Sequence, residues 1–101
     1  MSSLAKQRIK IANDIQRIIE AAFKKAASEH GRALTPELIA PFLYRARQLI
    51  AQTFPLVKLH SYTFERSLMT VMDKAKIPGR IQGHITQEYK SYRSQKPSSF
   101  K

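Results

Sequence analysis

Apolar residues recur at helical spacing through the first third of the chain. At about 100° per residue, the apolar positions between Leu4 and Glu29 fall on one face. Gly31 follows, and glycine commonly ends helices because it tolerates the left-handed conformation. The pattern predicts a long helix over residues 4–29, whose inward face carries Leu4, Ile11, Ile15, Ile18, Ile19, Ala22 and Ala26.

A second helix is predicted by its start signal. Thr35 can cap the helix, Pro36 suits the first helical position, and Glu37 favours the positive helix end. Pro41 interrupts the pattern because it cannot donate a backbone hydrogen bond to the carbonyl of Glu37, so the helix either kinks or begins there. It should end before Pro55. Its inward face is expected to carry Leu38, Ile39, Phe42, Leu43, Ala46, Leu49 and Ile50.

Two more helices are predicted in the second half, over residues 62–76 and 80–93, with a tight turn at Pro78 and Gly79. Residues 56–61 are ambiguous and could form an extended connector. The inward positions are Phe64, Leu68, Val71, Met72 and Ala75 in one helix, and Ile81, Ile85, Tyr89 and Tyr92 in the other. We therefore expect an all-α, four-helix bundle-like domain over residues 1–94 and a flexible basic tail over residues 95–101.

Charge is the informative feature of the composition. The 101 residues include 18 Lys and Arg against 7 Asp and Glu, a net charge of +11. The positive charges of such a domain repel one another, and a polyanionic partner would relieve this repulsion. The candidates are nucleic acid first, an acidic membrane surface second and an acidic protein third. The absence of cysteine excludes disulfides and thiolate metal sites. No apolar run approaches the roughly 18 residues of a membrane span, and the N-terminus lacks a signal peptide's apolar region, so we expect a cytoplasmic protein without a membrane partner.

The first predicted helix carries a row of cations opposite its isoleucine face. The row lies within about 40° of arc and spans roughly 27 Å. Glu20 and Asn13 are the only non-cationic residues near it. Such a row could follow several phosphates of a nucleic acid, although a solvated helix face is the alternative interpretation. We call this row the basic rail; it consists of Lys6, Lys10, Arg17 and Lys24.

The second predicted helix adds an aromatic residue beside two arginines. Tyr44 lies opposite Phe42 and Ala46, so we expect it to be exposed. An exposed tyrosine next to Arg45 and Arg47 suits base stacking and phosphate pairing on a single strand. A tyrosine that covers the rim of the core is the alternative.

A second basic patch is predicted near the C-terminus. Residues 74–101 carry seven cations and one acid, Glu88. Lys90 points away from the inward face of its helix, with Arg80 and Arg93 to either side. These three residues complete the set of candidate nucleic-acid contacts.

Residues 71–90 resemble a helix-turn-helix in part. The matching positions are Ala75, Gly79 and Ile85. Other positions that are usually apolar in this motif hold Lys74, Pro78, Arg80 and Glu88. If the motif is real, the residues that face the major groove are Gln82, Thr86 and Gln87.

Signals for catalysis are weak. The acids are scattered without a catalytic pair, no histidine has a second histidine at i+3 or i+4, and no glycine-rich phosphate loop is present. His60, the Gly83-His84 pair and Tyr92 resemble part of the catalytic half of tyrosine recombinases. Thr63 stands where that family has an arginine, and without this charge the transferring phosphate loses its main stabilisation. We therefore expect no enzyme, no metal and no cofactor.

Shape and charge along the whole chain resemble the small helical subunits of multi-subunit CRISPR effector complexes. The resemblance is carried by the basic rail, the segment 42–50 and the basic C-terminal end, without a diagnostic motif. It implies several copies side by side in a ribonucleoprotein, with DNA or RNA along the basic face. The expected function is therefore non-catalytic nucleic-acid binding within a larger assembly. A phage- or plasmid-type helix-turn-helix regulator and a protein that binds an acidic partner are the alternatives.

Overall fold

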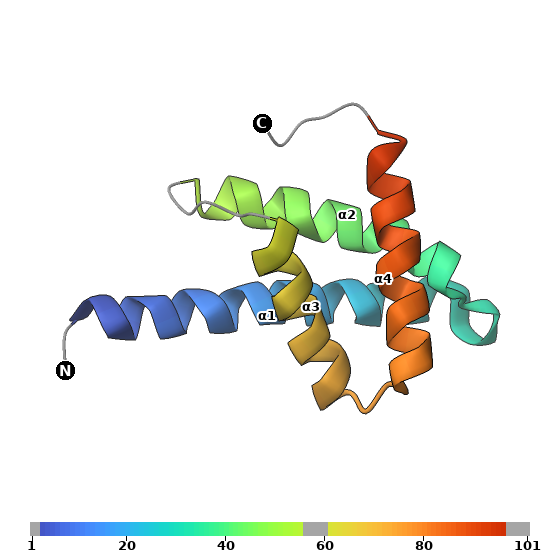
Figure 1. The fold of residues 1–101 in the computed structure, drawn as a ribbon, viewed down its shortest axis with the longest axis horizontal. Coiled ribbons are helices and arrows are strands. Elements are labelled where there is room, and N and C mark those ends of the chain that lie inside the picture. The colour runs from blue at the N-terminus through green and yellow to red at the C-terminus, as the bar shows by residue number, and fades with distance from the viewer. Residues whose placement is uncertain (1–2, 56–60, 97–101) are drawn as a thin grey trace.

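The protein is an all-α domain, as the sequence predicts. The structure, a computed structural model, describes residues 3–55 and 61–96, and contains no strand within these ranges. A short 3₁₀ turn, η1 (Gly31–Ala33), follows the first helix (Figure 1). The four α-helices are α1 (Ser3–His30), α2 (Pro36–Thr53), α3 (Ser61–Lys74) and α4 (Gly79–Ser94).

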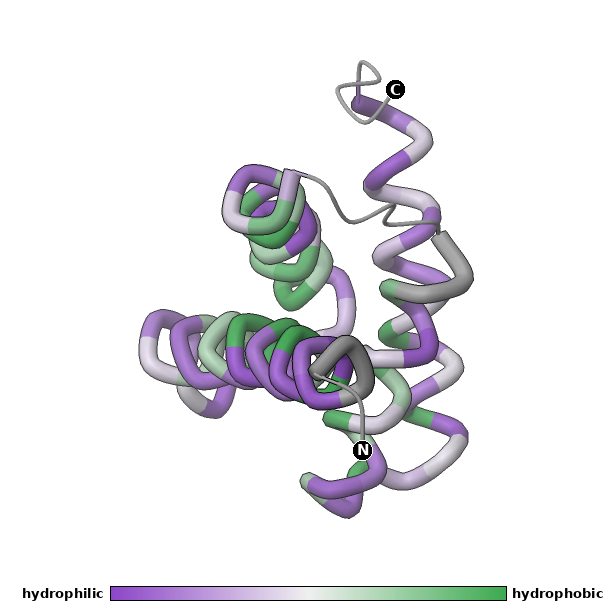
Figure 2. Tube along the Cα trace, turned by 90° about the vertical axis from the view of Figure 1, so that its left-hand side faces the viewer, coloured by the Kyte–Doolittle hydropathy of each residue, from purple (hydrophilic) through white to green (hydrophobic). Residues whose placement is uncertain are grey.

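The four helices form two hairpins in two layers. Helices α1 and α2 lie side by side and run in opposite directions, and α3 and α4 cross them in the second layer (Figures 1 and 2). Helix α3 packs mainly on α1 and α4 mainly on α2, whereas α3 and α4 touch each other little. The core therefore lies between the layers and depends on the crossings.

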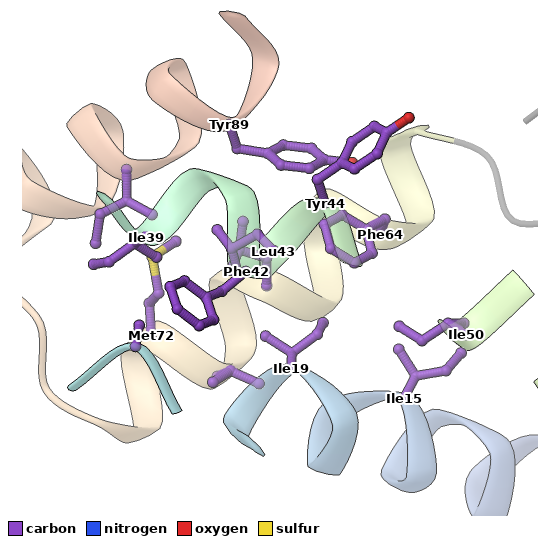
Figure 3. Packing of buried hydrophobic residues seen from close by; sticks show 14 residues of the cluster. Ile15, Ile19, Ile39, Phe42, Leu43, Tyr44, Ile50, Phe64, Met72 and Tyr89 are labelled. Carbon is purple, nitrogen blue, oxygen red and sulfur yellow. The ribbon is translucent and has the colours of Figure 1, made fainter. Parts of the chain in front are cut away.

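Every helix contributes to this core. The rings of Phe64 from α3 and Tyr89 from α4 lie 5.1 Å apart between their centroids, and both residues are fully buried (Figure 3). Aromatic pairs at this separation add about 1 kcal/mol beyond the burial of their area. The largest fully buried side chains are Tyr89, Phe64, Ile19, Leu43, Ile50, Leu68, Met72 and Ile85.

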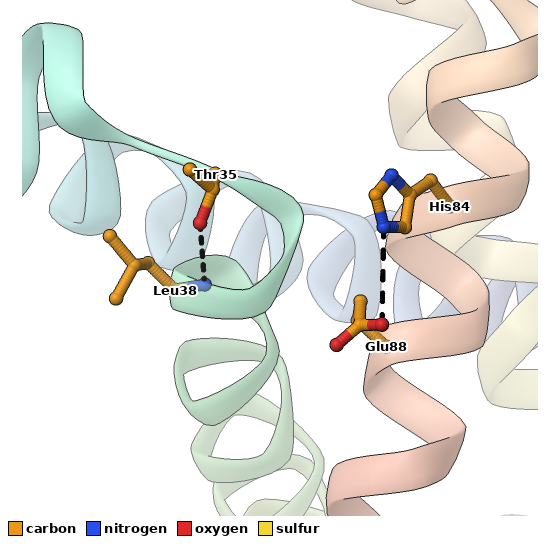
Figure 4. Close-up of polar contacts among 4 residues, drawn as sticks. All are labelled: Thr35, Leu38, His84 and Glu88. Atoms are coloured by element: carbon orange, nitrogen blue, oxygen red, sulfur yellow. Dashed lines mark hydrogen bonds and ion pairs between the residues drawn. The ribbon is translucent and has the colours of Figure 1, made fainter.

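The predicted start of α2 is confirmed. The hydroxyl of Thr35 accepts a hydrogen bond from the backbone N–H of Leu38 at 3.3 Å, and Pro36 is the first helical residue (Figure 4). The helix continues through Pro41, so the alternative that it begins there is wrong. The carbonyl of Glu37, which loses its usual donor, belongs to an exposed residue of the first turn.

The other boundaries differ from the predictions by one or two residues. Helix α1 ends at His30, and Gly31 has the left-handed φ of 54° that the stop signal anticipated. Helix α4 extends to Ser94. Residues 97–101 of the predicted tail and most of the predicted connector lie outside the described residues, so the tail stays a prediction.

Helix α3 ends two residues earlier than predicted, because Lys76 adopts a left-handed conformation with a φ of 59°. The backbone N–H of Lys76 donates to the carbonyl of Asp73 at 3.0 Å, and that of Ile77 donates to Met72 at 3.1 Å. This is the Schellman pair of hydrogen bonds, whose left-handed position is usually occupied by glycine. A residue with a Cβ costs about 1 kcal/mol there.

Replacement of Lys76 by glycine should therefore stabilise the fold. We expect Lys76→Gly to raise the free energy of unfolding in urea by about 0.5–1 kcal/mol, because relief of the left-handed strain exceeds the added freedom of the unfolded chain. Lys24→Gly, in the exposed interior of α1, should lower it by a similar amount. Equal losses in the two variants would contradict this account of the α3 terminus.

Candidate nucleic-acid interface

The basic rail lies on the solvent side of α1. The buried positions of this helix are Ile15, Ile19 and Ala26, which lie about 180–220° around the helix axis from Lys6. Helices α2 and α3 pack against α1 on its other sides. All four rail residues are exposed, so the predicted placement of Lys6, Lys10, Arg17 and Lys24 is confirmed.

One neighbour of the rail was missed by the sequence reasoning. Nη1 of Arg17 lies 4.0 Å from Oδ1 of Asp14, one helical turn earlier, and the arginine side chain is 79% exposed. An exposed pair of this kind contributes about 0.5 kcal/mol or less. Arg17 can therefore exchange Asp14 for a phosphate at little cost.

The prediction that Tyr44 is exposed is wrong. Tyr44 is only 8% exposed, and its ring meets that of Tyr92 edge-on at 5.5 Å between centroids. Helix α2 packs against both α1 and α4, so two of its faces are buried instead of one. Tyr44 therefore belongs to the core and cannot serve as a platform for an unpaired base.

Arg47 is also buried, at 5% exposure, which contradicts its prediction as a phosphate contact. Its guanidinium carbon lies 5.7 Å from the centroid of Phe64, between the two layers, an arrangement that favours cation–π attraction. Arg45 is exposed, 5.5 Å from the ring of Phe42, and lines a shallow groove between α1 and α2 together with Lys25. The two arginines therefore have different environments, although one residue separates them.

Replacement by alanine should change the free energy of unfolding by different amounts at these two arginines. Arg47→Ala should lower the free energy of unfolding by about 2–4 kcal/mol, as expected when a long buried side chain leaves a cavity. Arg45→Ala should change it by no more than about 0.5 kcal/mol, as is usual at an exposed position. Thermal or urea unfolding measures both, and similar values for the two variants would show that Arg47 is not a core residue.

The hydroxyl of Tyr89 lies in the same interior region. Burial raises the pKa of Tyr89 above its usual value of 10.0, and the nearby charges of Arg47 and Arg93 oppose the rise without reversing it. The proton is therefore held more tightly in the folded state than in the unfolded state. The stabilisation that this provides is present below pH 10 and is lost as the pH rises through the folded-state pKa.

The dependence of stability on pH should reveal the raised pKa of the Tyr89 hydroxyl. We expect the parent protein to lose more stability than Tyr89→Phe as the pH is raised above about 10, because the phenylalanine variant has no proton to release. Urea unfolding at several alkaline pH values measures the difference between the two proteins. A difference that stays constant with pH would show that burial does not raise the pKa of Tyr89.

The C-terminal cations do not form one uniform exposed patch. Arg80 is exposed at the start of α4. Nζ of Lys90 lies 3.8 Å from Oε2 of Glu65 on α3, and Arg93 is half-buried with its guanidinium carbon 5.5 Å from the ring of Tyr89. Lys90 and Arg93 therefore have contacts within the domain that compete with a phosphate.

The predicted helix-turn-helix residues close the α3–α4 turn. Nε2 of Gln82 donates to Oδ1 of Asp73 at 2.9 Å and to the carbonyl of Ile77 at 2.8 Å. The hydroxyl of Thr86 donates to the carbonyl of Gln82 at 2.9 Å. Of the three residues expected to face a groove, only Gln87 is exposed.

Two of the residues that suggested catalysis have contacts within the domain. Tyr92 is half-buried against the core, and Nε2 of His84 lies 3.9 Å from Oε2 of Glu88 (Figure 4). His60 lies outside the described residues. Within residues 3–55 and 61–96, no three histidine or acidic side chains gather as metal ligands. In the same ranges, no helix has the length and apolar character needed to cross a membrane.

Three apolar residues were wrongly assigned to the core. Ala75 is exposed, in the turn that follows α3. Leu49 is 50% exposed and Ile81 is 39% exposed. Ile81 lines a groove whose rim includes Lys74 and Lys76, two cations that the sequence reasoning did not select as site residues. Neither lysine has a sequence signal of its own, because the groove exists only where the four α-helices and the α3–α4 turn come together.

Comparison with known proteins yields no relative. No protein-family model matches the chain, and neither the curated proteins nor the solved structures contain a match. The resemblance to small CRISPR effector subunits stays a prediction from the sequence. Function is therefore inferred from the geometry and charge of the chain's own residues.

Proposed function

We propose that this protein binds nucleic acid without catalysis, and that the basic rail contacts the phosphate backbone. The observation that carries the proposal is the exposure of all four rail cations on the face of α1 opposite its buried stripe. The rail spans roughly 27 Å of helix, which corresponds to about eight base pairs of duplex. A straight row of cations of this length can follow one side of a nucleic-acid backbone.

The surroundings of the rail favour contact with phosphates over base recognition. Arginine and lysine neutralise phosphates and release counterions whatever the sequence. The burial of Tyr44 removes the stacking residue that the sequence suggested. The internal hydrogen bonds of Gln82 and Thr86 count against the helix-turn-helix alternative, because readers of base edges present such side chains outward.

The proposal includes a place in a larger ribonucleoprotein or DNA-binding assembly, such as a CRISPR effector complex in the cytoplasm. Its support is the sequence resemblance together with the net charge of +11, which a nucleic acid or other polyanion would offset. The chemistry of the rail suits DNA and RNA equally, since both offer phosphates at close spacing.

The dependence of affinity on salt concentration tests the rail. We expect the fourfold variant Lys6→Gln, Lys10→Gln, Arg17→Gln and Lys24→Gln to stay folded, because glutamine is a good helix former. Each lost phosphate contact flattens the slope of log affinity against log salt by about 0.7 on a single strand and about 0.9 on a duplex. The variant should therefore lose roughly 3–4 units of slope, measured by fluorescence anisotropy on unrelated oligonucleotides.

A matched control removes the same charge elsewhere. The control uses four of the exposed cations that lie off the rail, one each on the other face of α1, on η1, on α3 and after α4: Arg8, Arg32, Arg66 and Lys96. Their replacement by glutamine should change the slope by less than about one unit. If the control variant and the rail variant flatten the slope equally, binding depends on total charge and the rail has no special role.

A further inference from the structure

A groove opens on the side of the domain where the connection between α1 and α2 lies near the turn between α3 and α4. It has a volume of about 610 Å³ and lies between α1, the start of α2 and the α3–α4 turn. A neighbouring hollow of about 640 Å³ shares part of the floor and continues along the first turns of α4 to Arg80 and His84. The larger apolar side chains that line the groove are Phe23, Leu34, Ile39, Val71, Ile77, Ile81 and Ile85.

The rim of this groove is strongly basic. Nζ of Lys74 is held by a hydrogen bond to Oε1 of Gln16 at 2.9 Å, which fixes its charge beside α1. Among the described residues, Glu20 is the only acidic one that lines either hollow, so cations outnumber acids four to one there. The rim cations are Lys24, Lys74, Lys76 and Arg80.

Ile81 is an apolar residue of the groove that the domain leaves partly exposed to solvent. It points into the groove with 39% of its surface exposed, although it lies on the same helix as the fully buried Ile85. Covering an exposed isoleucine and its apolar neighbours releases free energy in proportion to the area removed from water. An apolar floor inside a charged rim is typical of a surface that binds another chain.

We propose that this groove binds an acidic amphipathic segment of a protein partner. Leucine- or isoleucine-like side chains of the segment would cover Ile81 and its neighbours, as amphipathic helices do in hydrophobic grooves. Aspartate or glutamate on the flanks of the segment would face the rim lysines. This site is separate from nucleic-acid binding and does not rest on it, although Lys24 belongs to both the rail and the rim.

The lining chemistry argues against two other occupants. An unpaired base stacks on aromatic faces, but among the described residues Phe23 alone brings an aromatic ring to a floor that is otherwise mostly branched aliphatic. A second copy of the chain in the groove would place a strongly basic molecule, of net charge +11, against the basic rim without an acidic segment to offset it. The acidic segment alone satisfies both the floor and the rim.

Two displayed peptide libraries test the proposal on the full chain. Both contain 14-residue segments with apolar residues at i, i+3, i+4 and i+7; one carries Asp and Glu at the flanking positions and the other Lys and Arg. We expect binders from the acidic library only. Synthetic copies of the binders should shift the amide NMR signals of groove residues such as Leu34, Ile77 and Ile81.

A pair of variants places the binding in the groove. Ile81 is the third residue of α4, where glutamate favours the positive helix end, so Ile81→Glu should fold. It should weaken the selected peptides about tenfold or more, as loss of a central apolar contact does. Met69→Glu makes the same charge change at an exposed apolar site on α3 and should leave their affinity unchanged.

Three results would overturn the proposal. One is the selection of no binders, or of equal numbers from the two libraries. Another is a shift of the same groove signals by an oligothymidylate in the absence of peptide, which would assign the groove to nucleic acid. The third is concentration-dependent self-association that Ile81→Glu abolishes and Met69→Glu does not. The salt slope for nucleic acid should be equal in the two variants, so failure here is distinct from failure of the rail.

Discussion

The rotation of α1 about its own axis is the constraint on which both proposed surfaces depend. Ile15 and Ile19 are buried against the rest of the domain, and they fix which side of the 28-residue helix meets solvent. A shift of one residue in this packing would turn the helix by about 100° and carry the rail into a neighbouring helix. The exposed row of cations is therefore a consequence of how two isoleucines pack.

The groove depends on how little the two helices of the second layer, α3 and α4, contact each other. Because α3 rests on α1 and α4 rests on α2, the α3–α4 turn stands away from the end of the first hairpin. Gln82 holds this turn closed through its bonds to Asp73 and Ile77, and Lys76 accepts a left-handed conformation within it. A tighter contact between α3 and α4 would bury Ile81 and fill the space that now forms the groove floor.

Periodicity was sufficient to predict the four helices, because each presents a continuous apolar stripe, and capping residues located the start of α2. It failed where a helix has more than one buried face. Tyr44 and Arg47 lie outside the single stripe expected for α2, but this helix packs on α1 and on α4. The exposure of Ile81 was missed for the opposite reason, since an apolar residue on the expected face has no neighbour there to cover it. Helical spacing describes one helix at a time, whereas burial depends on which helices cross.

The two proposed surfaces should select different anionic partners, because their cations have different neighbouring side chains. The rail presents cations on a polar face, a surface suited to phosphates, whereas the rim cations surround aliphatic side chains that phosphates cannot cover. Lys24 lies on the border and belongs to both proposed surfaces. A ligand that neutralises Lys24 at one surface leaves less positive potential at the other surface. Two bound anionic ligands also repel each other across α1. On these proposals each partner weakens the other's binding, and by linkage the effect is reciprocal. Nucleic acid and an acidic partner would then exchange at this end of α1, most strongly at low salt, where screening is least.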